Sequence, residues 1–310
     1  MYLGSIVCYF LFGSSMVSKL NPDDFRSCRL ILDPDDFALG DDGPDPPPSD
    51  LIPRKVWEGI MTLPGDVAIR TTNHQGARAA MLYRLHVAWM GAIPAEGVVA
   101  EAMLEAGDDF EAALFNLLHG FYKQAISSLR SAIELMMLGC TSEIAMNTET
   151  WTAWENGEEI KIKEVFDKVQ RVPVIRAFED EVRRITGTSL FAGDNGSGRN
   201  AWARSLYRRL SSYSHTRGIT TNSYFWQSNG PVYSTEGLRV SYQSLLETYA
   251  FLLLIGRIAC PGLRMPNGAR VIYERDSLGQ FLELSFRVLC EHCVSRLFDG
   301  NNGQSKVKPG

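Results

Sequence analysis

The sequence predicts a mainly α-helical protein, a helical bundle with one short β-hairpin insert. Three observations lead to this fold class. Apolar residues recur at spacings of three and four along most of the chain after about residue 54. Short stretches rich in glycine, proline or asparagine separate these helical runs. Aromatic and β-branched residues flank Asn229-Gly230, a pair that is typical of a tight hairpin turn.

Composition limits the classes of function. The chain has 310 residues, of which 45% are hydrophobic and 22% charged, an ordinary globular balance. A chain of this length can bury a substantial core. The net charge of −5 excludes a protein that binds nucleic acid through its overall charge, so any such surface must be local.

The cysteines predict a reducing compartment. They are scattered, and several lie in apolar helical runs: Cys8, Cys28, Cys140, Cys260, Cys290 and Cys293. This pattern favours reduced thiols in a cytoplasmic protein over a disulfide framework. Cys290 and Cys293 form a CxxC pair, but no second pair completes a zinc site, so no metal is expected.

Residues 1–53 are expected to precede the folded domain. The first dozen residues are apolar, with no basic residues before them and too few for a membrane span, so no membrane partner is expected. They are an atypical leader, a buried strand or helix, or the result of a start codon assigned too early. The last interpretation, with Met16 as the natural start, is favoured. Residues 33–50, rich in Asp and Pro, predict a linker or an extended arm.

Residues 54–300 are expected to form the helical domain. After Pro94 the pattern fits one long amphipathic helix or two abutting ones, with Gly139 as the stop. Asn156-Gly157 predicts a turn that precedes a short helix. The later elements are helices over 174–186, 201–215, 238–259 and 278–298, a hairpin near 222–235 and a disordered tail over 301–310.

A basic stretch without acidic residues lies in the second half of the chain. No Asp or Glu occurs between Asp194 and Glu236. The same interval holds Arg199, Arg204, Arg208, Arg209, His215 and Arg217. Guanidinium groups match phosphate oxygens in pairs, so this stretch fits a phosphate or RNA surface. A solvated helix face that offsets nearby acidic helices explains it equally well.

Spacing divides these basic residues. On a continuous helix Arg208 and His215, seven apart, share one face, and Arg204 extends it. Arg209 converges with His215 only if the serines between them end the helix early. His215 could transfer protons at neutral pH, and an arginine could stabilise negative charge on a phosphate. The alternative is that His215 caps the end of the helix. Substrate-binding candidates are Arg204, Tyr213, Arg217 and Arg130.

An arginine followed four to six residues later by a histidine, near the end of a helix, resembles the motif of the HEPN superfamily. Both Arg208 and Arg209 fit this spacing to His215. The resemblance implies a compact bundle over roughly 95–298, a homodimer with a composite cleft, and RNA cleavage in toxin–antitoxin or phage-defence systems. It also implies an accompanying acidic residue on an earlier helix. Glu134, four residues after Arg130, is the candidate, although the two also suit an ordinary helical ion pair.

The leading hypothesis is an RNA-binding protein and candidate metal-independent endoribonuclease, with His215, Arg208 or Arg209, and Glu134 as catalytic residues. The chain departs from the superfamily at the position after the motif arginine, which is Leu210 or Arg209 here. The alternative is a non-enzymatic helical module that binds an acidic partner, such as an antitoxin, or nucleic acid. No cofactor motif occurs, so no cofactor is expected.

Overall fold

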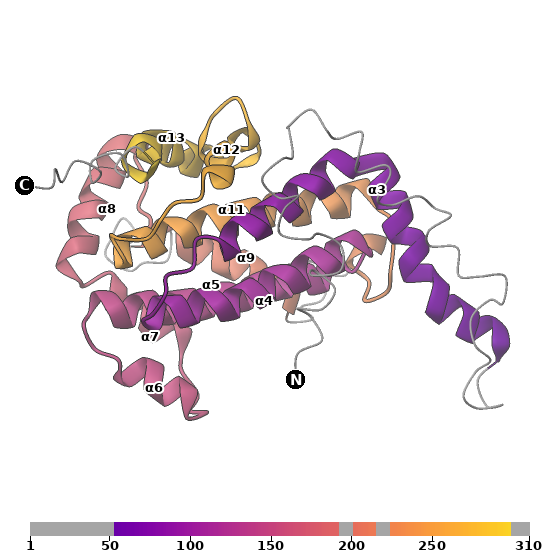
Figure 1. The fold of residues 1–310 in the computed structure, drawn as a ribbon, viewed down its shortest axis with the longest axis horizontal. Coiled ribbons are helices and arrows are strands. Elements are labelled where there is room, and N and C mark those ends of the chain that lie inside the picture. The colour runs from indigo at the N-terminus through magenta and orange to yellow at the C-terminus, as the bar shows by residue number, and fades with distance from the viewer. Residues whose placement is uncertain (1–52, 192–200, 215–223, 299–310) are drawn as a thin grey trace, which may run out of the picture.

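The structure, a computed structural model, describes residues 53–191, 201–214 and 224–298, which form an all-α bundle without a β-strand (Figure 1). Its α-helices are α3 (Arg54–Met90), α4 (Val98–Leu118), α5 (Tyr122–Ile144), α6 (Glu149–Glu155), α7 (Ile162–Val169), α8 (Pro173–Thr186), α9 (Trp202–Ser214), α11 (Thr235–Ala259), α12 (Arg270–Tyr273) and α13 (Leu284–Phe298). Short 3-10 turns are η4 (Phe225–Gln227), η5 (Asn267–Ala269) and η6 (Leu278–Phe281). The predictions for residues 1–52 and 301–310 lie outside the described residues.

The antiparallel pair α4 and α5 forms the centre of the bundle (Figure 1). The long helical stretch is therefore two helices, one of the two alternatives that the sequence left open. The turn between them contains Gly120, whose φ of +80° is a left-handed conformation that favours glycine. A Cβ at Gly120 would also lie 2.3 Å from the carbonyl oxygen of Val232, so the turn is closely covered.

The prediction that Gly139 stops the helix is wrong, because α5 continues to Ile144. Gly139 instead allows α4 and α5 to approach each other closely. A Cβ on Gly139 would lie 2.5 Å from the Cβ of Ala102 on α4. The glycine is thus a packing residue inside a helix and not its end signal.

Helix α11 packs along α5 and is the most completely buried helix of the bundle. Its N-cap is Ser234, whose side chain accepts a hydrogen bond from the N–H of Gly237. The second half of α3 packs against α4, and aromatic rings join these helices. The Trp89 Nε1–H donates to the carbonyl of Met103 at 2.8 Å, and the Tyr249 hydroxyl donates to the carbonyl of Leu85 at 2.7 Å.

The first half of α3 projects away from the bundle (Figure 1). Pro64 lies inside this helix, and Gln75 has a non-helical φ of −135°, which marks a kink. Several large apolar side chains before Pro64 are exposed, namely Val56, Ile60, Met61 and Leu63.

The predicted β-hairpin near 222–235 is wrong for the part that the structure describes, from residue 224 on. Residues Phe225–Gln227 form a 3-10 turn in which the N–H of Gln227 donates to the carbonyl of Tyr224 at 2.9 Å. Trp226 is buried against Tyr122 and Tyr213, with ring centroids 6.4 and 6.0 Å away. Trp226 therefore packs onto helices α5 and α9, whereas the neighbouring Tyr224 is exposed.

The helix predicted over 278–298 is wrong in its first part, because residues Leu278–Phe281 form the 3-10 turn η6, Leu282 is extended and α13 begins only at Leu284. Two other predicted features agree with the structure. The turn at Asn156-Gly157 follows α6, with Gly157 at a φ of +81°, and the short helix α7 comes after it. Helix α8 starts at Pro173 and ends at the left-handed Gly187.

Among the described residues, no helix combines the length and apolar character needed to cross a membrane. The described cysteines, Cys140, Cys260, Cys290 and Cys293, are free thiols. Cys290 and Cys293 are both buried in α13.

Candidate functional site

Helix α9 carries the basic stretch and packs on α5 and α11. Its buried side chains, Ala203, Leu206 and Leu210, are spaced by three and four residues, which directs one face into the core. The described helix extends to Ser214, and His215 lies outside the described residues. Arg208 and Arg209 therefore both stay candidate partners of His215.

Arg204 does not face solvent as an open phosphate contact. Its guanidinium donates to a carboxylate oxygen of Asp167 on α7 at 2.6 Å. The guanidinium carbon also lies 5.4 Å from the ring centroid of Phe166. Because only 13% of the Arg204 side chain is exposed, its main role in this structure is to join α9 to α7.

Arg209 forms an ion pair with Glu247 of α11, whose side chain is completely buried. The other Glu247 oxygen accepts hydrogen bonds from the Gln243 side chain at 2.9 Å and from the N–H of Glu283 at 3.0 Å. A buried carboxylate needs such donors, since an unpaired charge in the interior is very unfavourable. Glu247 therefore ties together α9, α11 and the start of α13.

Arg208 lies on the outer side of α9 and is exposed. Its guanidinium donates to the hydroxyl of Ser205 at 3.1 Å. Arg208 is thus an exposed arginine of α9 on the side of the helix that faces solvent.

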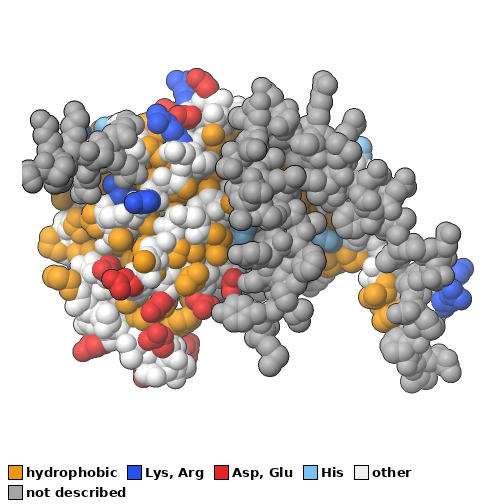
Figure 2. All heavy atoms as spheres, in the orientation of Figure 1, with side chains coloured by type: hydrophobic (Ala, Val, Ile, Leu, Met, Phe, Trp, Pro, Cys, Tyr) orange, Lys and Arg blue, Asp and Glu red, His pale blue; other side chains and the backbone are white. Residues whose placement is uncertain are grey.

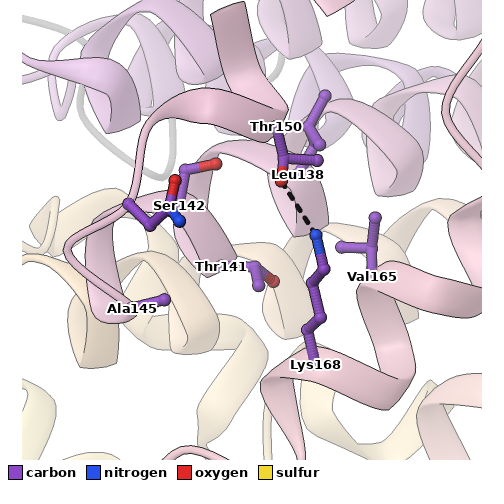
Figure 3. Close-up of a pocket in the computed structure, with 8 residues that line it drawn as sticks. Leu138, Thr141, Ser142, Ala145, Thr150, Val165 and Lys168 are labelled. Atoms are coloured by element: carbon purple, nitrogen blue, oxygen red, sulfur yellow. Dashed lines mark hydrogen bonds between the residues drawn. The ribbon is translucent and has the colours of Figure 1, made fainter. Parts of the chain in front are cut away.

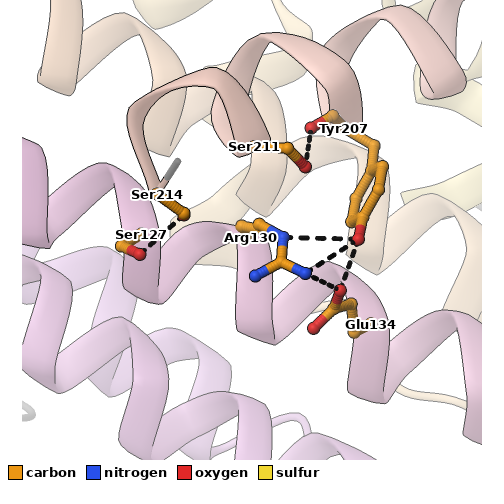
Figure 4. A network of polar contacts seen from close by, with 6 residues as sticks. All are labelled: Ser127, Arg130, Glu134, Tyr207, Ser211 and Ser214. Atoms are coloured by element: carbon orange, nitrogen blue, oxygen red, sulfur yellow. Dashed lines mark hydrogen bonds and ion pairs between the residues drawn. The ribbon is translucent and has the colours of Figure 1, made fainter. Parts of the chain in front are cut away.

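Arg130, Glu134 and Tyr207 form one network between α5 and α9 (Figure 4). Arg130 and Glu134 are paired at 2.6 Å, which confirms that they interact across one helical turn. The Tyr207 hydroxyl donates to Glu134 and accepts from Arg130 at 3.1 Å. Burial, and then the hydrogen bond to Glu134, raise the pKa of Tyr207. Glu134 is therefore already engaged by two partners.

The end of α9 is held close to this network. The hydroxyls of Ser214 and of Ser127 on α5 lie 2.7 Å apart (Figure 4). Ser127 precedes Arg130 by less than one turn of α5. His215 directly follows Ser214 in the chain, but His215 and Arg217 both lie outside the described residues, as does Arg199.

Tyr213 is half-buried and packs on Trp226, with ring centroids 6.0 Å apart. Burial raises the pKa of its hydroxyl, although the charge of Arg209 acts in the opposite direction. The ring therefore contributes to the core beside η4. An open stacking platform for a base would require more exposure.

The described histidines lie away from this network and have their own contacts. The Nδ1 of His119 lies 2.8 Å from the Phe115 carbonyl, and His74 packs on Tyr233. His292 lies 3.1 Å from Glu181, which Arg296 also contacts at 2.6 Å, and both partners lower the pKa of Glu181. Burial lowers the pKa of His86. Within residues 53–191, 201–214 and 224–298, no group of three or more His, Cys, Asp or Glu residues could hold a metal ion.

Three acidic residues that the sequence analysis missed shape this region, namely Asp109, Asp167 and Glu247. Glu247 had a detectable signal, because it is a lone carboxylate inside the apolar run of α11. Asp167 had none, since an acidic residue on a short amphipathic helix is ordinary. The pKa of Asp109 is raised to about 6, first by burial and then by the charges of Asp108, Glu105 and Glu134, against which a hydrogen bond from Ser131 acts.

The charge of the face drawn in Figure 2 is mixed. Figure 2 shows acidic side chains gathered at the lower left of this view, where Figure 1 places α4 to α7. Lysine and arginine side chains gather higher on the same face. A nucleic acid would therefore be repelled from the acidic end of the bundle.

The chain was compared with known proteins at three levels: no family model matches it, no curated protein matches it, and no solved structure matches it.

Proposed function

We propose that this protein binds RNA through the outer face of α9 and the residues that follow it, and cleaves RNA without a metal ion. The observation that carries the proposal is the position of Arg208. It is exposed on a helix that continues to Ser214, and Ser214 is held against α5 by Ser127 at 2.7 Å. His215 follows Arg208 by seven residues, and it comes directly after Ser214, which is anchored on α5.

In the proposed reaction, His215 takes the proton of a ribose 2′-hydroxyl, whose oxygen attacks the adjacent phosphorus. The bond from phosphorus to the 5′-oxygen breaks, and the leaving oxygen takes the proton back from the protonated His215, which returns to its neutral form. Arg208 stabilises the negative charge that develops on the phosphate oxygens. The products are a 2′,3′-cyclic phosphate and a free 5′-hydroxyl.

The remaining candidates receive supporting roles in this proposal. Arg209 and Arg204 position α9 through Glu247 and Asp167, in place of the direct phosphate contacts that their spacing suggested. The network of Arg130, Glu134 and Tyr207 holds α5 and α9 together below the site. Arg217 adds a further cation near the phosphate. The resemblance to the HEPN superfamily favours a homodimer and a toxin or phage-defence role, with an antitoxin as a protein partner.

The test measures degradation of a labelled, unstructured RNA by the purified full chain in EDTA. We expect His215→Ala and Arg208→Ala each to lower the cleavage rate by about 10²-fold or more. Arg239→Ala is the matched control, because Arg239 is an exposed arginine that pairs only with Glu236 on its own helix in the contacts described. Full activity of His215→Ala, or no cleavage by folded wild-type protein, would contradict the proposed chemistry.

A second candidate function is a non-enzymatic helical module that binds nucleic acid or an acidic partner. The observation that favours it is the internal pairing of Arg204 and Arg209, which makes part of the basic stretch structural. Salt-dependent RNA binding that Arg208→Ala weakens, without cleavage, would support this module. Binding to an acidic protein but not to RNA would exclude RNA as the ligand.

A further inference from the structure

A small pocket lies between the end of α5 and the pair α6 and α7, on different elements from the Arg208 face (Figure 3). Its volume is about 120 Å³. It is lined by Leu138, Thr141, Ser142, Ala145, Asn147, Thr150, Val165 and Lys168. No lining residue is acidic, and Lys168 is the basic one. The inference drawn from this pocket does not depend on the proposed RNA function.

Two buried hydroxyls in the pocket wall lack hydrogen-bond partners. Thr141 is 5% exposed and Ser142 is 3% exposed, and neither side-chain oxygen has a partner in the structure. A buried hydroxyl without a partner is unfavourable, so such groups normally find an acceptor. Both residues come from the same turn of α5 and face the pocket shown in Figure 3.

Other hydroxyl side chains in the helices of this protein find a hydrogen-bond acceptor within their own helix. Thr71 and Thr186 each donate to the carbonyl four residues earlier, both at 2.9 Å. Thr141 and Ser142 do not use this option, although they are buried. Ser241 and Thr248 also lack partners, but they are not part of this pocket wall. The hydroxyls at Thr141 and Ser142 are therefore available to a molecule that enters the pocket.

The opposite wall supplies a positive charge. The Lys168 ammonium donates to the Thr150 hydroxyl at 3.0 Å (Figure 3). An ammonium group has three N–H donors, so it can bond another acceptor as well. Leu138 and Val165 provide apolar surface beside it. The pocket thus combines one cation, two hydroxyl donors and a hydrocarbon wall.

We propose that this pocket binds a small monocarboxylate with a short apolar body. The carboxylate would accept hydrogen bonds from Lys168 and from the hydroxyls of Thr141 and Ser142, and the hydrocarbon part would contact Leu138 and Val165. The size agrees, since an apolar protein cavity of roughly 150 Å³ holds a molecule as large as benzene. A dianion such as phosphate fits less well, because it has no apolar part to place against the hydrocarbon wall.

The first test is calorimetric titration of the full chain with sodium butyrate and, separately, with the neutral butyramide. We expect butyrate to bind, and butyramide to bind about tenfold more weakly or worse, because a hydrogen bond to a charged group is stronger than a neutral one. Lys168→Gln should weaken butyrate binding by a similar factor. Lys163→Gln is the control, because Lys163 is an exposed lysine of α7 outside the pocket wall.

The second test separates binding from folding. Thr141→Val and Ser142→Ala remove the unpartnered hydroxyls while keeping the side chains close in size or smaller. We expect each variant to unfold thermally at or above the temperature of the wild type, and to bind butyrate several-fold more weakly. Absence of butyrate binding, equal binding of butyramide, or unchanged binding by Lys168→Gln and Ser142→Ala would overturn the proposal.

Discussion

At the scale of single residues, acidic side chains from distant parts of the chain decide what the arginines of α9 can do. Asp167 holds Arg204, and the buried Glu247 holds Arg209. Arg208, one residue before Arg209, is exposed and donates to the hydroxyl of Ser205 on its own helix. The basic stretch is therefore a mixture of structural and solvent-facing cations, although its local sequence contains no acid to suggest this.

Asp109 leads to a prediction about pH. Its pKa is raised to about 6, first by burial, with a hydrogen bond from Ser131 acting against this and nearby carboxylates adding to it. A raised folded-state pKa means that the contribution of Asp109 to stability is fully present below its unfolded pKa. That contribution is lost as the pH rises through about 6.

We expect the stability of Asp109→Asn, relative to that of the wild type, to increase as the pH rises from about 4 to about 8. The gain should be about 1 kcal/mol after allowance for solvent screening. Urea unfolding at several pH values measures it. Asp108→Asn is the matched control, since Asp108 is the exposed neighbour, and its effect should change little with pH. A gain that does not depend on pH would contradict the assigned environment of Asp109.

At the scale of elements, close approach of α4 and α5 determines how the bundle is built. At the contact between Gly139 and Ala102 the two helices are so close that no side chain fits on Gly139 without a shift. Glycine lowers helix propensity, so a mid-helix glycine is tolerated where packing requires it. The interface, and not the local propensity, explains why α5 continues past this residue.

This interface predicts opposite effects for two glycine substitutions. Gly139→Ala should destabilise the protein by about 1–3 kcal/mol, because its methyl group would collide with Ala102. Gly59→Ala in the projecting part of α3 should raise stability or helicity by about 0.5–1 kcal/mol, since nothing lies within 4 Å of its Cβ position. Urea unfolding followed by circular dichroism compares them. A neutral Gly139→Ala would show that the helices can separate at little cost.

At the scale of the whole molecule, one core joins the central helices to α12 and α13. Tyr273 and Tyr249 are completely or almost completely buried in it, and each of their hydroxyls donates to a backbone carbonyl. Cys140 and Cys290 are also completely buried there. Burial raises the pKa of both thiols, so neither provides a reactive thiolate near neutral pH.

The closed core predicts which cysteines are protected from alkylation. In native protein, iodoacetamide at about pH 8 should modify Cys140 and Cys290 at least ~10²-fold more slowly than the half-exposed Cys260. Cys293, whose pKa burial raises to about 11, should also react slowly. Peptide mass spectrometry with and without urea measures the rates. Equal rates for Cys140 and Cys260 in native protein would show that the core opens locally.

The sequence by itself determined the mainly α fold class and the positions of most described helices, because helical periodicity and end signals are local properties. It also determined the pair of Arg130 and Glu134, since residues four apart on a helix are neighbours. Only the tertiary structure decided the partners of Arg204 and Arg209, which lie 37 and 38 residues away in the chain. It also decided the place of Trp226, which packs onto helices in a 3-10 turn and not in a hairpin. The ion-pair partners and the packing of Trp226 depend on which helix faces meet in the folded protein. Burial of side chains that are distant in sequence outweighs local secondary-structure propensity, which is what a sequence pattern reports.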